Sequence, residues 1–237
     1  MPVFTVKTYN VEFTKDSDAA TVRAVGQGNP DIVCLQETTA AWEAALEKRY
    51  AEQYPYRLYR PLPGAAGLAV LSRYPMLDAG WLPAPNGWHP SWHVLVKTPA
   101  GWLQILNVHL RSLTVGNGGT VNSYLTTAGD HRYEIQAFTA DLTKDIPTMI
   151  MGDFNEPPDG TAVRYLEDQG YQNVLPLYHP GQPTWRHPGV AGEFETTLDH
   201  ILFDGSVEPL NAWVINAGNS DHLPVMAHFE AAYDWQN

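Results

Sequence analysis

Six short segments of the sequence place carboxylate, amide or imidazole side chains at the ends of apolar runs. The segments read YNVEF, IVCLQET, ILNVHLRS, MGDFNEPP, TTLDHILF and NSDHLPV. The polar residues that they contribute are Asn10, Glu12, Gln36, Glu37, Asn107, His109, Asp153, Asn155, Asp199, His200, Asp221 and His222. Charged side chains rarely remain beside buried strands unless they are paired or coordinate a metal. We therefore expect these clusters to converge on one site.

The donor atoms in these clusters are mostly oxygen. Oxygen-rich sites favour Mg²⁺, Mn²⁺ or Ca²⁺, whereas zinc prefers histidine and cysteine, and the sequence has a single cysteine, Cys34. His109 and His222 supply imidazoles for proton transfer or for donation to a developing anion. The sequence contains neither a serine in a Gly-flanked elbow nor a GxxxxGK[ST] phosphate loop. The residues thus indicate metal-assisted hydrolysis of a phosphoester.

The elements that must position these residues follow from hydrophobic periodicity and from turn residues. Strands are expected over residues 3–9, 31–35, 56–59, 68–72, 92–97, 103–110, 148–151, 198–203, 211–215 and 225–229. Helices are expected over residues 18–25, 40–54, 132–143 and 161–169, and irregular loops over 83–90, 112–129 and 178–192. Strands outnumber helices and alternate with them unevenly, which favours two packed sheets flanked by helices over one parallel sheet. We expect one domain over residues 1–237.

Composition narrows the function classes. The 14 Lys+Arg against 26 Asp+Glu give a formal net charge of −12, which argues against an architectural DNA coat or a polybasic membrane anchor. The sequence has no apolar stretch of about 20 residues that would span a membrane and no signal-peptide layout at its N-terminus. We expect a cytoplasmic monomer, or a secreted protein if a leader has been removed.

The six segments resemble, in order, the motifs of the endonuclease/exonuclease/phosphatase superfamily, and the resemblance runs from about Thr8 to Pro224. This group includes pancreatic-type deoxyribonucleases, apurinic-site endonucleases, neutral sphingomyelinases and inositol polyphosphate phosphatases. The resemblance implies an α/β fold, a four-layered sandwich of two mixed β-sheets packed face to face with helices on the outside. It places the active site at one end of the sheets.

The resemblance also implies a role for each motif residue. Glu37 would be the principal metal ligand, and Asn10, Glu12 and Asp221 would complete the shell directly or through water. Asp153 and Asn155 would orient the attacking water and hold the phosphate. His222 would act as general base or stabilise the transition-state charge, oriented by Asp199, and His109 would donate to a non-bridging oxygen.

Four further residues are candidates for substrate contact. Arg111 and Arg132 flank the Gly-rich loop and offer a second phosphate contact. Trp185 and Arg186 precede the strand that bears Asp199, and the resemblance places this segment near the substrate cleft. His200 is expected to be structural because it points away from Asp199 by strand alternation, and the other loop histidines, His89, His93, His131, His179 and His187, are expected at the surface.

The leading hypothesis is a Mg²⁺-dependent phosphodiesterase, with Mn²⁺ or Ca²⁺ as alternatives, that acts as a nuclease on DNA by in-line attack of an activated water. The alternative is a phosphatase or phosphodiesterase for small or lipid phosphoesters such as inositol phosphates or sphingomyelin. The net charge of −12 favours this alternative, since tight nucleic-acid binders carry a basic stripe. A binding module without activity is disfavoured because every motif position is filled.

Overall fold

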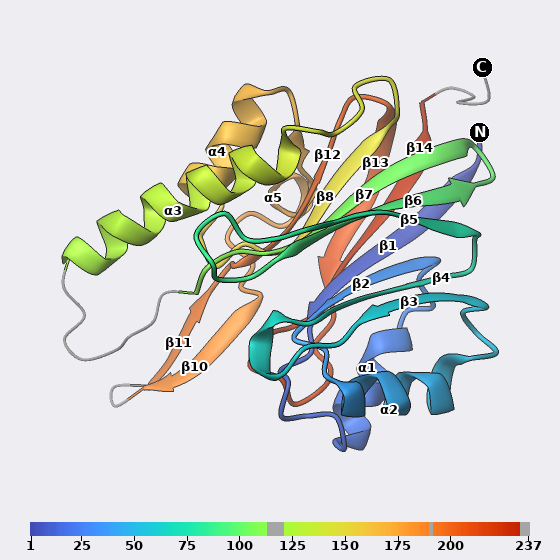
Figure 1. Ribbon diagram of the computed structural model, residues 1–237, viewed down its shortest axis with the longest axis horizontal. Coiled ribbons are helices and arrows are strands. Elements are labelled where there is room, and N and C mark those ends of the chain that lie inside the picture. The colour runs from blue at the N-terminus through green and yellow to red at the C-terminus, as the bar shows by residue number, and fades with distance from the viewer. Residues whose placement is uncertain (113–120, 190–191, 233–237) are drawn as a thin grey trace.

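The computed structural model describes residues 1–112, 121–189 and 192–232. Two six-stranded mixed sheets form most of the molecule (Figure 1). The first sheet has the order β13-β14-β1-β2-β4-β3, built from β1 (Val3–Asn10), β2 (Ile32–Gln36), β3 (Tyr56–Arg60), β4 (Leu68–Ser72), β13 (Val207–Val214) and β14 (Val225–Ala231). The second has the order β5-β6-β7-β8-β12-β9, built from β5 (Met76–Leu82), β6 (Ser91–Thr98), β7 (Gly101–His109), β8 (Thr148–Asp153), β9 (Gln172–Asn173) and β12 (Asp199–Phe203).

Each sheet contains one parallel pair of neighbouring strands, which sets the end at which polar residues gather. β1 pairs in parallel with β2, and β7 pairs in parallel with β8. The strands of a parallel pair end at the same edge of the sheet, so the residues that follow them lie together. A separate two-stranded hairpin, β10 (Trp185–Gly189) and β11 (Gly192–Thr196), belongs to neither sheet.

Helices cover the outer face of each sheet. They are α1 (Ala19–Gly26), α2 (Ala40–Tyr50), α3 (Val121–Thr139) and α4 (Thr161–Asp168). The short α5 (Val174–Tyr178) instead contributes to the core between the sheets, and a 3-10 turn, η1 (Gly64–Ala66), precedes β4. Figure 1 shows α1 and α2 on the side of the first sheet, and α3 and α4 on the side of the second. This arrangement confirms the expected sandwich of two mixed sheets with helices outside.

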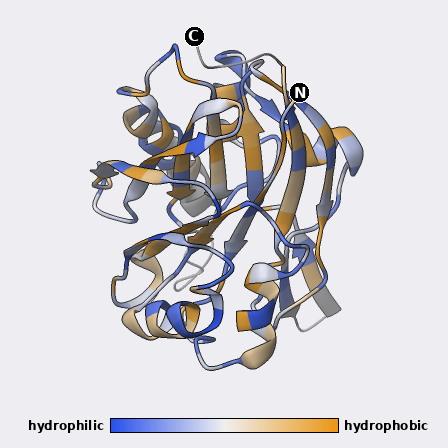
Figure 2. Cartoon of the chain, turned by 90° about the vertical axis from the view of Figure 1, so that its right-hand side faces the viewer, coloured by the Kyte–Doolittle hydropathy of each residue, from blue (hydrophilic) through white to orange (hydrophobic). Residues whose placement is uncertain are grey.

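Three apolar cores join the four layers. Between the sheets, Phe229 packs against Phe4 and Phe203, with ring centroids 6.1 and 5.2 Å away. A second core joins α1 and α2 to the first sheet and includes Trp42 and Leu46, while a third joins α3 and α4 to the second sheet. Figure 2 shows hydrophobic residues concentrated in the strands. Burying large side chains of this kind stabilises the fold by about 1.5–3 kcal/mol each.

The N-terminus of α1 is held by Asp18, the N-cap residue. Its Oδ1 accepts hydrogen bonds from the backbone N–H and the hydroxyl of Thr21, both at 2.7 Å, and its Oδ2 accepts one from the Asn219 amide at 3.0 Å. The Thr21 hydroxyl and backbone lower the pKa of Asp18 to about 2. Asp18 therefore caps α1 and also ties it to the loop that precedes Asp221.

We expect Asp18→Ala to lower the free energy of unfolding by about 1 kcal/mol, the usual loss on removing a capping side chain. Because the pKa of Asp18 is below its ordinary value of 3.8 in the folded protein, the stabilisation is present above pH 3.8 and disappears as pH falls through about 2. Urea denaturation of both proteins at neutral pH and at acid pH measures the difference. Asp16→Ala is the control and should change stability by less than about 0.5 kcal/mol; equal stability of Asp18→Ala and wild type at neutral pH would contradict the cap.

The structure corrects the sequence-based prediction in several segments. Residues 121–129 were expected in a loop, but they form the first half of α3, which begins at Val121 and ends at Thr139 and not at residue 143. Their polar sequence lacks apolar periodicity, and packing against α4 supplies the helix with its partner. Residues 113–120 of the same predicted loop lie outside the described residues. The expected irregular segment 178–192 contains β10, and β5, β9 and α5 were not anticipated because they are short or exposed.

Candidate active site

The motif residues gather at one end of the two sheets. Asn10 ends β1, Gln36 ends β2, His109 ends β7 and Asp153 ends β8. The strand register sets His109 beside Asp153, and Asp199, the first residue of β12, beside Asp153 on its other side. The parallel pairing in both sheets therefore brings together side chains that are far apart in the sequence.

Asp153 lies at the centre of the site and is fully buried. Its Oδ2 accepts a hydrogen bond from the Asn10 amide at 2.9 Å and lies 3.5 Å from Nε2 of both His109 and His222. Its Oδ1 accepts one from the backbone N–H of Asn155 at 2.9 Å. Burial alone would raise the pKa of Asp153, but the two imidazoles and Asn10 hold it below its usual range. Asp153 is thus an ionised carboxylate between two imidazoles.

His222 is oriented by Asp199. The Nδ1 of His222 donates to Asp199 Oδ2 at 2.9 Å, and the Thr184 hydroxyl donates to the same oxygen at 2.6 Å. Burial would lower the pKa of His222, but the carboxylates of Asp199 and Asp153 outweigh burial and raise it. Both ring nitrogens of His222 face carboxylates, which favours the doubly protonated imidazolium.

His109 is held in a similar way on the opposite side of Asp153. Its Nδ1 lies 3.1 Å from the Ala65 carbonyl oxygen in η1, and its ring stacks on His89 with centroids 4.2 Å apart and an interplanar angle of 2°. His89 was expected to lie at the surface without a partner; instead, burial and the neighbouring His109 lower the pKa of His89 to about 3. A neutral ring therefore covers one face of His109.

A second correction concerns His131, also expected at the surface. His131 is buried, with Nδ1 3.0 Å from Glu156 Oε2 and Nε2 2.6 Å from the Arg111 carbonyl oxygen. Glu156 in turn accepts hydrogen bonds from the first turn of α4 at Ala162 and Val163. His131 thus joins the end of β7 to the turn after β8, and sequence spacing gave no sign of it because the contacts join distant segments. His200 is structural as expected, bound to Asn173 and to the Glu156 carbonyl.

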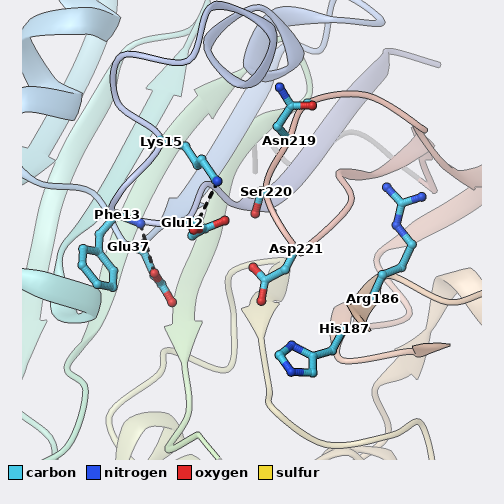
Figure 3. Close-up of a pocket in the computed structure, with 10 residues that line it drawn as sticks. Glu12, Phe13, Lys15, Glu37, Arg186, His187, Asn219, Ser220 and Asp221 are labelled. Carbon is cyan, nitrogen blue, oxygen red and sulfur yellow. Dashed lines mark hydrogen bonds and ion pairs between the residues drawn. The ribbon is translucent and has the colours of Figure 1, made fainter. Parts of the chain in front are cut away.

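The carboxylates of Glu12, Glu37 and Asp221 line a cleft of about 790 Å³ beside Asp153, and Figure 3 shows all three among the residues that line it. Glu37 accepts hydrogen bonds from the Asn10 amide and from the backbone N–H of Phe13, both at 3.1 Å. Glu12 lies 3.7 Å from the Lys15 ammonium. Asp221 Oδ2 accepts a hydrogen bond from the Trp185 indole at 2.9 Å.

This donor set fits a hard divalent cation. Three carboxylates face one cleft, where the lining cations among the described residues are Lys15 and Arg186, and oxygen ligands of this kind suit Mg²⁺. A different group, Asp153, Asp199 and His222, also has ligand atoms within 4.8 Å of one another. There Asp199 Oδ2 already accepts hydrogen bonds from His222 and Thr184, and all three residues are buried, whereas Glu37 and Asp221 are partly exposed in the cleft. Glu37 and Asp221 are therefore the better ligand candidates.

The backbone around the site adopts unusual conformations. Glu12, Glu37 and Asn155 all have positive φ angles, of 56°, 64° and 51°. For residues with a side chain this left-handed region is uncommon and costs on the order of 1 kcal/mol. Such strain gathers at functional sites when the surrounding structure holds it in place.

The structure brings two of the four expected substrate contacts to the cleft. Arg186 lines the cleft, and Trp185 lines the adjoining cavity that contains Asp153 and His222. Arg132 does not reach the cleft, since its guanidinium lies over the Tyr165 ring on α4 at 5.5 Å. Arg111 pairs with Asp130 and lies over the Trp88 ring at 4.3 Å, and it does not line the cleft. Sequence reasoning missed three residues here, Thr184, His187 and Phe194, of which Thr184 could be suspected only from its place before Trp185.

Two face-to-face mixed sheets, with carboxylates and imidazoles in a cleft at one end of both, define the deoxyribonuclease-like class of α/β sandwich. A model of the Endonuclease/Exonuclease/phosphatase family matches residues 8–222, and the chain belongs to this family. Family membership supports a hydrolase that acts on phosphoester bonds. The family is generally dependent on a divalent metal.

Solved structures show the same fold at low sequence identity. An endonuclease/exonuclease/phosphatase from Beutenbergia cavernae DSM 12333 has a TM-score of 0.76 at 16% identity, over 98% of this chain and 72% of that chain. TDP2 from D. rerio complexed with single strand DNA product has a TM-score of 0.73 at 16% identity, over 98% and 100%. An AP endonuclease from Archaeoglobus fulgidus has a TM-score of 0.72 at 16% identity, over 94% and 98%.

One curated relative is larger than the matched region. The chain is 22% identical over 153 residues to endonuclease/exonuclease/phosphatase family domain-containing protein 1 of Bos taurus. The match covers 56% of this chain and 26% of that protein. The chain thus aligns with about a quarter of that relative. Within the described part of the chain, the helices are too short or too polar to span a membrane.

Proposed function

We propose that this chain is a divalent-metal-dependent phosphodiesterase that cleaves nucleic acid, with DNA as the substrate and Mg²⁺ as the metal. The observation that carries the proposal is the placement of His109 and His222 on either side of ionised Asp153, next to the carboxylate cleft. Phosphodiester cleavage requires in-line attack and neutralisation of charge on the phosphate oxygens. The TDP2 structure with a DNA product adds support for a nucleic-acid substrate.

In this proposal the site residues have separate roles in metal binding and catalysis. Glu37 and Asp221, with Asn10 and Glu12, would hold the cation, which neutralises charge on the phosphate and the leaving oxygen when bound. Asp153 orients the attacking water, and Asn155, whose amide donates to the Leu110 carbonyl at 3.0 Å, is fixed in the same wall. His222, held by Asp199, and His109 donate to non-bridging oxygens. Monomeric state and location in the cytoplasm, or outside the cell after removal of a leader, remain parts of the same proposal.

The direct test is cleavage of supercoiled plasmid with Mg²⁺ or with EDTA. We expect nicking with Mg²⁺ that EDTA abolishes. Glu37→Gln should lower the activity about 10–100-fold, the loss typical of altered metal-site partners, and additional Mg²⁺ should restore part of it. Glu52→Gln, an exposed carboxylate after α2, is the control and should behave as wild type. Full activity of Glu37→Gln at low Mg²⁺ would show that the metal site is misassigned.

The alternative substrate is a small or lipid phosphoester, such as an inositol phosphate or sphingomyelin. The formal net charge of −12 favours it, because few cations are available to hold a long polyanion. Hydrolysis of bis-p-nitrophenyl phosphate together with no cleavage of DNA under Mg²⁺, Mn²⁺ or Ca²⁺ would support this alternative over the nuclease.

A further inference from the structure

The β10–β11 hairpin has two chemically different faces. Trp185 and His187 lie two residues apart on β10 and point to the same face. Their cross-strand partners on β11 are Thr196 and Phe194. All four residues line a cavity of about 630 Å³ that also contains Asp153 and His222. The opposite face carries Arg186 paired across the strands with Glu195. One face of the hairpin is therefore an aromatic wall of the active site.

The three aromatic rings of this wall contact one another through stacked and edge-on pairs. Trp185 and His187 are parallel, with centroids 5.5 Å apart and an interplanar angle of 3°, and Phe194 meets Trp185 edge-on at 6.2 Å. Phe194 is 64% exposed, and His187 is also exposed. We call Trp185, His187 and Phe194 the aromatic face. An exposed aromatic surface of this kind beside a catalytic group is typical of a binding surface.

The position of the aromatic face is fixed by the catalytic residues. The Trp185 backbone forms an isolated bridge with His222, and its indole donates to Asp221. The Arg186 N–H donates to the Asp221 carbonyl oxygen at 2.9 Å. The hairpin projects from the two sheets in Figure 1, so its base is anchored at the site while its aromatic face extends from it. A group attached to a phosphate at Asp153 and His222 would lie against this face.

The two cavities have few positively charged side chains that could bind the phosphates of a substrate. Lys15 and Arg186 are the lysine and arginine side chains among the described residues that line the two cavities, and Lys15 is paired with Glu12. Proteins that bind duplex DNA tightly neutralise many phosphates with lysine and arginine side chains. Here contacts to the flat, apolar part of the substrate must supply more of the binding energy.

We propose that the aromatic face stacks an unpaired nucleobase next to the scissile phosphate, so that the substrate is single-stranded nucleic acid. This inference rests on the proposed function. Base–aromatic stacking contributes about 1–3 kcal/mol per base and tolerates any base. In the interior of a duplex both faces of each base are covered by its neighbours, so an internal base must be unpaired to lie against Phe194 and His187.

The test compares three substrates that have the same number of phosphates in the strand that is assayed for cleavage. They are an oligothymidylate of about ten nucleotides, an oligomer of equal length with abasic tetrahydrofuran sugars, and the thymidylate paired with its complement. We expect wild type to cleave the single-stranded thymidylate with a kcat/KM about 5–150-fold above the other two, the range that corresponds to the stacking energy of one base. Salt should weaken cleavage of the thymidylate only modestly.

Variants of Phe194 then separate stacking from a general apolar contact. Phe194→Ala and Phe194→Leu should lower kcat/KM on the thymidylate about 5–150-fold and leave kcat/KM on the abasic oligomer unchanged, whereas Phe194→Trp should retain activity. His187→Ala should act in the same direction as Phe194→Ala. Tyr56→Ala removes a ring that is also partly exposed but lies at the opposite end of its sheet from Gln36, and it should behave as wild type.

The outcomes distinguish this inference from the proposed function. Equal cleavage of abasic and thymidylate oligomers, or faster cleavage of the duplex, would overturn the stacking inference while the nuclease function stands. Retained activity of Phe194→Leu would point to an aliphatic partner and also overturn it. Hydrolysis of bis-p-nitrophenyl phosphate without cleavage of any oligomer would overturn both proposals.

Discussion

Replacement of His222 by alanine is expected to lower the rate of phosphodiester cleavage by about 10²–10⁴-fold, the usual contribution of a positioned acid or base. The imidazole of His222 has its Nδ1 on Asp199 and its Nε2 directed at Asp153. Alanine removes both contacts and the positive charge that faces the phosphate. We expect the loss to appear in kcat more than in KM, because charge on the phosphate oxygens grows in the transition state.

Because Asp199 orients the His222 imidazole, replacement of Asp199 should also lower the rate. Asp199→Asn should lower the rate by itself, because the amide no longer holds the imidazolium in the same way. The double variant should be no slower than His222→Ala, since Asp199 acts through His222 and residues of one unit are not additive. His179→Gln, an exposed histidine at the end of α5, is the control. Additive losses in the double variant would mean that Asp199 acts independently.

The second large effect is expected from Gly152→Ala, which should destabilise the protein by about 3–5 kcal/mol. Gly152 lies on β8 with φ of 153°, opposite Val108 on the parallel neighbour β7. A Cβ atom at this position would lie 1.9 Å from the Val108 carbonyl oxygen. Because the obstructing atom belongs to the backbone of a central strand, β7 and β8 must move apart to relieve the clash.

Thermal denaturation by circular dichroism measures this effect, and we expect the Tm to fall by about 10 °C. Activity should fall further than stability alone predicts, since the strands that move carry His109 and Asp153. Gly205→Ala is the matched control, because a Cβ atom there meets no other atom within 4 Å, and it should change stability by less than about 0.5 kcal/mol. A Tm within about 2 °C of wild type would show that the strands accommodate the methyl group.

Sequence reasoning succeeded where local pattern and strand ends carry the information. The apolar runs before Asn10, Glu37 and Asp153 marked central strands, and parallel pairing then placed these residues together. It failed where partners are distant in the sequence. The surface expectation for His89 and His131 was wrong because each is covered by a segment that spacing cannot reveal. The loop predicted over the first half of α3 was wrong for a different reason, because the polar residues there lack the hydrophobic period that indicates a helix.

The hydrogen bond from Asn10 to Asp153 has a consequence for how the enzyme matures. It joins strands of different sheets across 143 residues of chain, and Gln36 donates to Asn107 between the same sheets at 2.8 Å. A slip of one residue between the sheets, about 3.3 Å, would break both bonds while each sheet kept its own strands. Long-range docking of this kind is slow compared with local structure formation. We therefore expect activity to return during refolding only when the two sheets have docked in the register that forms both bonds.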